Sequence, residues 1–248
     1  MAFFKIENTN FYHENSYLSI SDLVSWKKQR NAYNFKTLPE VAIIALKKNV
    51  FSNELHPFMK RIKGFSGSHY KYNSKILLCS EFGIGSSAVV LLLEELKELG
   101  VKKFVFLGLA GMLDNSINDN VSFIISKVYS STGCSYFYNK NELLEYYDKE
   151  WFKHIEQVFN LSKQTAWSTD SPFRETPSMI DYYKKMGCSL VDMECAGVYA
   201  FSQFYKIPSV CILIGADRLT KPKWQEPVNF NRLLDEQRRV VKQLLKTL

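Results

Sequence analysis

The chain has 248 residues and a formal net charge of +7, with 46% hydrophobic and 23% charged residues, which is typical of a soluble globular protein. No apolar run approaches the roughly 18 residues that span a bilayer, and the N-terminal residues lack the features of a secretory signal, so we expect a cytoplasmic protein with no membrane partner. Lysines and arginines are spread along the chain without a nucleic-acid-binding motif, which predicts a solvated basic surface and no nucleic-acid partner.

Cysteine and histidine spacing argues against disulfides and metals. The cysteines are odd in number and lack CxxC spacing, which indicates reduced thiols. The histidines also lack paired ligand spacing, so we expect no metal site and no bound cofactor. These residues are Cys79, Cys134, Cys188, Cys195 and Cys211, and His13, His56, His69 and His154.

No repeat or Pro/Gly-rich linker divides the sequence, so we expect a single domain over residues 1–248, with residues 1–38 as an N-terminal extension. Four unbroken apolar runs predict strands buried on both faces. Between the second and third runs, the segment SSAVVLLLEELKELG begins with serines and ends on glycine, as helices often do. This strand–helix–strand order predicts a right-handed crossover and a largely parallel sheet. The strand runs are 41–46, 75–80, 103–108 and 209–216, and the helix is 86–100.

Two further segments predict helices. Residues 141–159 are amphipathic and rich in aromatic side chains, and residues 230–248 place apolar side chains on one stripe at spacings of three and four. The predicted fold class is therefore α/β: a three-layer α/β/α sandwich with a mixed, largely parallel central sheet.

Polar and glycine-rich segments follow the predicted strands, where ligands bind in such sheets. EFGIGSS (81–87) and GLAGML (108–113) are expected to be turns, and the acids of DMEC (192–195) follow a short strand at 188–191. Gly85, Ser86 and Ser87 open a helix and form a candidate anion site, because N–H groups are exposed there. Glycines at such turns are as often purely structural.

The order of these motifs resembles the nucleoside phosphorylase and nucleosidase superfamily, the branch with purine nucleoside phosphorylase, uridine phosphorylase and methylthioadenosine nucleosidase. The resemblance rests on GIGSSAVVLLLEELKELGVKKFVFLGLAG, then STDSPFRET, then VDMECAGVYAFSQFYKIPSVCILIGADR. It covers the chain from about Val41 onward. It implies a phosphorylase-like fold, a small-molecule nucleoside as ligand, and a homodimer or a hexamer built from dimers.

The resemblance also implies site residues. Met193 would pack on the sugar and Glu194 would hold its 2′ and 3′ hydroxyls, where a carboxylate also stabilises the oxocarbenium-like transition state. Asp217 would be the general acid that protonates the departing base, which favours a purine because N7 can accept the proton. The alternatives are that Glu194 caps the following helix, and that Asp217 is a helix N-cap or pairs with Arg218.

STDSPFRET occupies the base-recognition segment of that family. Phe173 or Pro172 would lie against the base or sugar, and Asp170 would order the loop. Arg174 has two readings. It either holds a carbonyl of the base or pairs with Glu175 or a neighbouring subunit.

The phosphate-binding pattern of the family is broken here. Phe106 and Leu109 stand where phosphorylases carry an arginine and a hydroxyl residue, and phosphate needs cationic or N–H donors. Lys60 or Arg61 could replace them across a dimer interface.

Three functions follow from these motifs. The first is phosphorolysis of a purine-type nucleoside, with inorganic phosphate as co-substrate. The second is hydrolysis of the same N-glycosidic bond by water. The third is nucleoside binding without catalysis.

Overall fold

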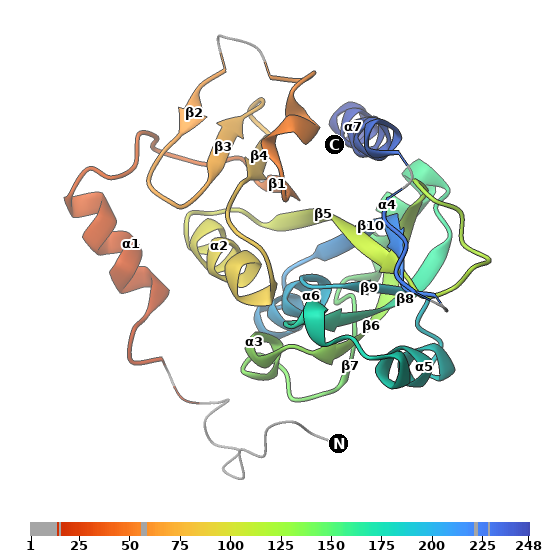
Figure 1. Ribbon diagram of the computed structural model, residues 1–248. Helices are drawn as coiled ribbons and strands as arrows, with labels where there is room; N and C mark the ends of the chain where they lie inside the picture. Colours follow the sequence, from red (N-terminus) through yellow and green to blue (C-terminus); the bar gives the residue numbers. More distant parts are fainter. Residues whose placement is uncertain (1–13, 15, 56–58, 221–222, 228) are drawn as a thin grey trace.

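The computed structural model describes residue 14 and residues 16–55, 59–220, 223–227 and 229–248. Its centre is a ten-stranded mixed sheet in the order β10-β6-β8-β9-β5-β1-β4-β3-β2, with β7 paired to β6 (Figure 1). The strands are β1 Val41–Ala45, β2 Arg61–Ile62, β3 Ser68–Lys71, β4 Ile76–Ser80, β5 Lys103–Met112, β6 Ser122–Ser131, β7 Leu143–Glu145, β8 Lys163–Thr169, β9 Leu190–Asp192 and β10 Ser209–Arg218.

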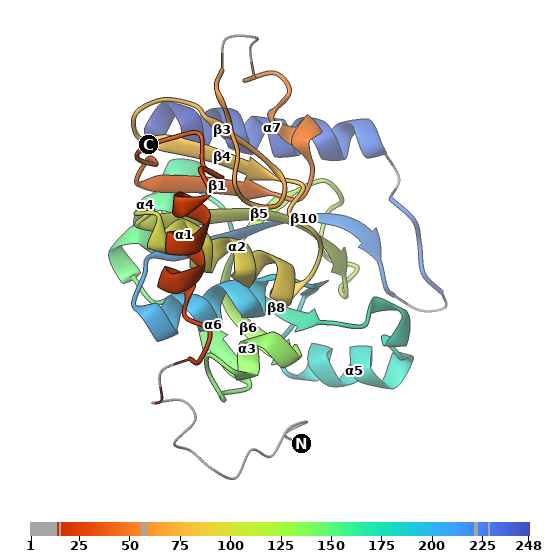
Figure 2. The ribbon, with the colours of Figure 1, turned by 90° about the vertical axis from the view of Figure 1, so that its left-hand side faces the viewer.

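Helices cover both faces of the sheet, as Figure 2 shows for α7 on one side and α2 and α6 on the other. Ala42 and Ile44 of β1 point into a core formed with α2 and α6. Ile43 and Ala45, which alternate with them, point into a second core formed with α4 and α7. The predicted α/β class is therefore confirmed, with a sheet in which most residue pairs are parallel. The helices are α1 Ile20–Gln29, η2 Lys48–Phe51, α2 Ser86–Glu98, α3 Gly133–Tyr136, α4 Lys149–Phe159, η3 Pro172–Arg174, α5 Pro177–Lys185, α6 Cys195–Tyr205 and α7 Phe230–Thr247.

Part of the sheet closes on itself. β10 pairs with both β5 and β6, and β9 pairs with both β5 and β8. The strands β5, β10, β6, β8 and β9 therefore form a ring, with β6 joined to β8. This closure brings the ends of β5, β9 and β10 together, and these ends carry the candidate site.

The predicted turn at 108–113 is wrong, because β5 continues to Met112. Gly111 pairs with Asp217 of β10 and with Val191 of β9. A Cβ built on Gly111 would lie 2.2 Å from Cδ1 of Leu219 and 3.5 Å from Oδ1 of Asp217. The glycine therefore permits close packing at the strand ends and does not reverse the chain.

The predicted helix at 141–159 is wrong in its first half. Leu144 is buried in strand β7, opposite Val128 of β6. Helix α4 starts only at Lys149, where the Asp148 carboxylate accepts a hydrogen bond from the N–H of Trp151 at 2.7 Å. Pairing with β6 has overridden the helical pattern of this short segment. The predicted helices at 86–100 and 230–248 are confirmed as α2 and α7.

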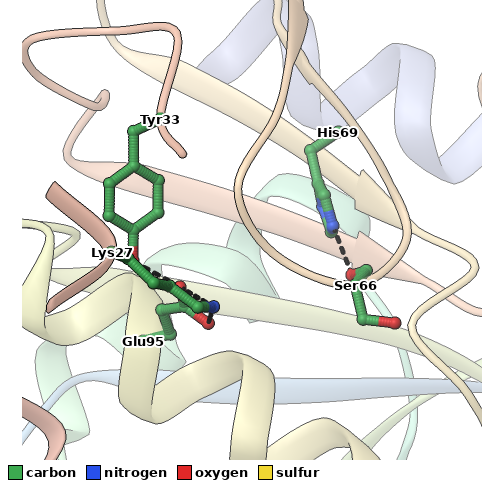
Figure 3. A network of polar contacts seen from close by, with 5 residues as sticks. All are labelled: Lys27, Tyr33, Ser66, His69 and Glu95. Carbon is green, nitrogen blue, oxygen red and sulfur yellow. Dashed lines mark hydrogen bonds and ion pairs between the residues drawn. The ribbon is translucent and has the colours of Figure 1, made fainter. Parts of the chain in front are cut away.

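The N-terminal helix α1 is tied to α2 by a small polar network (Figure 3). Nζ of Lys27 lies 2.7 Å from Oε1 of Glu95, and the hydroxyl of Tyr33 donates to the same oxygen at 2.5 Å. The Glu95 side chain is only 9% exposed. Part of the predicted N-terminal extension thus packs on the α/β core, while residues 1–13 and 15 lie outside the described residues.

Candidate functional site

A cavity of about 340 Å³ opens where β5, β9 and β10 end. Its lining combines apolar side chains with four carboxylates, and no lysine or arginine is among the described residues that line it. Such a pocket binds a mostly apolar ligand and orients it through a few polar groups. The lining residues are Leu46, Ile84, Leu109, Ala110, Gly111, Pro172, Glu175, Val191, Asp192, Met193, Glu194, Ala216, Asp217, Leu219, Trp224, Pro227, Phe230 and Leu233.

Asp192 shapes the junction between β9 and α6. Its Oδ2 accepts hydrogen bonds from the N–H groups of Glu194, at 3.0 Å, and Cys195, at 2.8 Å. Its Oδ1 accepts a hydrogen bond from the Ser168 hydroxyl of β8. The carboxylate that satisfies the first N–H groups of α6 is thus Asp192 and not Glu194, which makes no such capping bond.

Glu194 therefore turns toward the cavity, although it is only 2% exposed. Its Oε1 accepts a hydrogen bond of 2.6 Å from the N–H of Gly85, which stands just before α2. Burial, and next the charge of Asp192, raise the pKa of Glu194 to about 7. The carboxylate is thus held in place and is close to half-protonated at neutral pH.

At the predicted anion site Gly85, Ser86 and Ser87, two polar groups are hydrogen-bonded within the protein. The N–H of Gly85 is already given to Glu194, and the Ser86 hydroxyl donates to the carbonyl of Met193 at 3.0 Å. Ser87 is exposed. None of these three residues lines the cavity. Through these two hydrogen bonds the turn holds the Met193–Glu194 segment in position.

Asp217 reaches the cavity from the end of β10. Its Oδ2 accepts a hydrogen bond of 2.6 Å from the indole N–H of Trp224. Asp217 lies within the strand and so is not a helix cap. Arg218 turns away, with its guanidinium 2.6 Å from Oδ1 of Asp119 and also donating to the carbonyl of Asp114. Neither alternative role of Asp217 is thus found.

Glu175 is a site residue that the sequence did not identify as one. It lines the cavity beside Asp217. Burial, and next the charge of Asp217, raise the pKa of Glu175 to about 7. The sequence holds one weak signal, an acid in the predicted base-recognition segment, but the motif predicts for it only a role as a partner of Arg174. Trp224, the hydrogen-bond donor to Asp217, was missed entirely.

The residues predicted to contact the base lie in several places. Pro172 lines the cavity, whereas Phe173 is fully exposed and Arg174 is exposed, and neither lines it. The three residues form the single turn η3, in which consecutive side chains point in different directions. Asp170 lies away from the cavity and accepts a hydrogen bond from the N–H of Gly133 at 2.7 Å, which joins two loops.

The basic residues proposed for phosphate are also distant from this lining. Lys60 and Arg61 are exposed at the edge strand β2, and neither lines the cavity. Phe106 is buried in the core, and Leu109 lines the cavity with an apolar side chain. Within one chain, the structure therefore does not bring these cations together with Glu194 and Asp217.

The described histidines and the cysteines lie apart from the lining of this cavity. His69 is fully buried, its Nε2 lies 2.7 Å from the carbonyl of Ser66 (Figure 3), and burial lowers its pKa to about 4. His13 and His56 lie outside the described residues. Within the described ranges no group of three or more His, Cys, Asp or Glu residues could hold a metal ion. The five cysteines are free thiols. No helix among the described residues is long and apolar enough to cross a membrane.

The cavity lies at strand ends of a partly closed α/β sheet, the place where proteins with such sheets commonly bind small molecules. The family model of the Phosphorylase superfamily matches residues 38–248, and the chain belongs to this superfamily. The chain is therefore of the nucleoside phosphorylase and nucleosidase type.

Individual relatives are distant. The chain is 26% identical over 207 residues to a DeoD-type purine nucleoside phosphorylase of Buchnera aphidicola subsp. Schizaphis graminum, covering 79% of this chain and 86% of that protein. It is 23% identical over 171 residues to the DeoD-type enzyme of Chromobacterium violaceum, covering 66% and 71%.

Solved structures share the fold. Purine nucleoside phosphorylase from Toxoplasma gondii, in complex with immucillin-H, superposes with a TM-score of 0.70 at 18% identity, over 85% of this chain and 90% of that one. Futalosine hydrolase of Helicobacter pylori strain 26695 superposes with a TM-score of 0.67 at 17% identity, over 85% and 99%. At these identities the likeness concerns the fold alone.

Proposed function

We propose that this protein cleaves the N-glycosidic bond of a purine-type nucleoside with water as the nucleophile. The observation that carries the proposal is the charge of the cavity. Glu194 and Asp217 line it together with two further carboxylates, and no lysine or arginine is among its described lining residues. A neutral nucleoside fits such a cavity, whereas a phosphate dianion meets like charge and finds no lysine or arginine among the described lining residues.

The chemistry needs two opposite roles from the acids. When the C–N bond breaks, its electron pair moves to the base and positive charge develops on the sugar. Asp217, held by Trp224, gives a proton to N7 of the leaving purine. Glu194, held by Gly85, stabilises the cationic sugar and binds its hydroxyls. Water then adds to the anomeric carbon and releases a proton that restores the acid form of Asp217, so that the products are the neutral base and free ribose.

Apolar residues complete the proposed site. Met193 lines the cavity next to Glu194 and would pack on the sugar. Of the two residues predicted to lie against the base or sugar, Pro172 lines the cavity and Phe173 does not, so Pro172 would contact the base. Apolar walls strengthen the electrostatic contribution of both carboxylates, because water screens the charges that it can reach.

Phosphorolysis is the second candidate, favoured by the two relatives that are named purine nucleoside phosphorylases. Inorganic phosphate would then be bound with help from another subunit. Arg61 begins the edge strand β2 and Lys60 directly precedes it, and from there both would reach a neighbour in a homodimer or a hexamer. Light scattering after size-exclusion chromatography would measure the size of that assembly.

The test is turnover of adenosine, inosine, guanosine, uridine and methylthioadenosine, each with and without phosphate. Free ribose in the absence of phosphate is the expected product, and Asp217→Asn should lower kcat about a hundredfold to ten-thousandfold. The control is Glu150→Gln, an exposed position on α4. Ribose 1-phosphate formed only with phosphate would establish the second candidate. Binding of these nucleosides without any release of base would refute both.

A further inference from the structure

Glu175 lines the cavity from the segment that the resemblance assigns to base recognition. It stands between η3 and α5, and its N–H donates to the carbonyl of Pro172 at 3.3 Å. The next residue, Thr176, caps α5 by accepting a hydrogen bond from the N–H of Met179 at 3.3 Å. Both neighbouring elements fix the backbone of Glu175, so less ordering is required when a ligand binds.

Glu175 and Asp217 share one region of the cavity. Both line it, and the charge of Asp217 acts on Glu175. The indole N–H of Trp224 is committed to Asp217, and the described lining contains no lysine or arginine that would neutralise the pair. An ionised Glu175 without a neighbouring cation attracts groups that carry hydrogen-bond donors.

The geometry points to a specificity role: we propose that Glu175 recognises the substituent at purine position 6 and selects 6-amino over 6-oxo bases. The inference rests on the proposed role of Asp217 at N7. On a purine, N7 and the 6-substituent occupy the same edge, with an amino donor in adenine and a carbonyl acceptor in guanine. A carboxylate beside Asp217 accepts a hydrogen bond from the amino group and repels the carbonyl oxygen.

This selection should depend on pH. The titratable groups lining the cavity with Glu175 are Asp192, Glu194 and Asp217. Since the pKa of Glu175 is about 7, its carboxylate is mainly ionised at pH 8 and accepts from a 6-amino group. At pH 6 it is mainly protonated, and its O–H donates to a 6-oxo group.

The experiment compares kcat/KM for adenosine and inosine at pH 6 and pH 8. Wild type should favour adenosine at pH 8 by about tenfold to a hundredfold, the range given by one hydrogen bond to a charged group. This preference should shrink at pH 6. Glu175→Gln should lower it at least about tenfold at pH 8 and remove its pH dependence, because an amide both donates and accepts. Glu150→Gln is the matched control and should leave it unchanged.

Binding of free adenine and hypoxanthine, measured by calorimetry on the same proteins, tests the inference without turnover. The expected result is preferential adenine binding that Glu175→Gln abolishes. Turnover with an unchanged adenosine to inosine ratio in Glu175→Gln would overturn the role of Glu175 and leave the proposed function intact. Base selection lost in Glu175→Gln without nucleoside cleavage by wild type would refute the proposed function alone. Equal binding of both bases by wild type would overturn the inference.

Discussion

Replacing Glu194 by glutamine should make the protein more stable and less active. Burial and Asp192 raise the pKa of Glu194 from its ordinary value of 4.5 to about 7. At about 1.36 kcal/mol per pKa unit, keeping this carboxylate ionised in the folded state costs on the order of 3 kcal/mol. Glutamine has no charge to desolvate, and its amide oxygen can still accept the hydrogen bond from Gly85.

The sign of the pH dependence follows from proton binding. Between pH 4.5 and pH 7 the folded state holds a proton on Glu194 that the unfolded state has lost, so the contribution of Glu194 to stability falls as pH rises through this window. The free energy of unfolding of Glu194→Gln should therefore be close to that of wild type at pH 4.5 and higher by up to about 3 kcal/mol at pH 8. Catalysis at pH 8 should fall about a hundredfold or more.

Urea unfolding of wild type and Glu194→Gln at pH 4.5, 6 and 8 measures the free energies of unfolding. Glu150→Gln, an exposed substitution, should differ from wild type by no more than about 0.5 kcal/mol at each pH. A Glu194→Gln protein that is less stable than wild type at pH 8, or whose difference from wild type is the same at all three pH values, would refute the reasoning. Such a result would mean that the carboxylate is stabilised in the apo protein.

Three further predictions concern packing and charge. Gly197→Ala should destabilise the fold by about 1–3 kcal/mol, because the new Cβ would lie 2.9 Å from Cβ of Ser86 and 3.1 Å from the backbone of that residue. Urea unfolding measures this loss of stability, and an unchanged unfolding midpoint would contradict the close contact between α2 and α6. Lys27→Met should lower stability by about 1–3 kcal/mol, since it leaves the Glu95 carboxylate without its cation. Proteolysis within α1 should be faster in this variant, and equal cleavage rates in variant and wild type would argue against the Lys27–Glu95 contact. Because the pKa of His69 is lowered to about 4, its contribution to stability is present above pH 6.5 and is lost as pH falls toward 4. His69→Gln should therefore reduce the fall in the free energy of unfolding over this pH range, and an identical fall in variant and wild type would show that His69 does not titrate there.

Local hydrophobic patterns and short motifs predicted several strands, a helix and the superfamily correctly. The runs at 41–46, 75–80 and 209–216 became β1, β4 and β10, because an unbroken apolar segment is stable only where both of its faces are buried. The stripe at 230–248 became α7 for the corresponding helical reason. The superfamily could also be recognised from the sequence, since its motifs are short and contiguous.

Two local predictions failed where pairing with distant strands decided the outcome. Residues 143–145 have a helical pattern but form β7, because β6 offers them backbone partners. GLAGML has the composition of a turn but continues β5, because β9 and β10 both pair with it. Backbone hydrogen bonds to a strand far away in the sequence leave no trace in local periodicity.

The sequence by itself determined the class of the fold, the superfamily and the presence of Glu194 and Asp217 near strand ends. Only the tertiary structure decided what those residues touch. Gly85 gives its N–H to a carboxylate 109 residues away, which turns an expected anion site into a support for Glu194. Ring closure of the sheet likewise brings Glu175 beside Asp217 in one cavity. The physical reason is that burial and charge, which set the pKa values of these acids, depend on all the segments that meet around them.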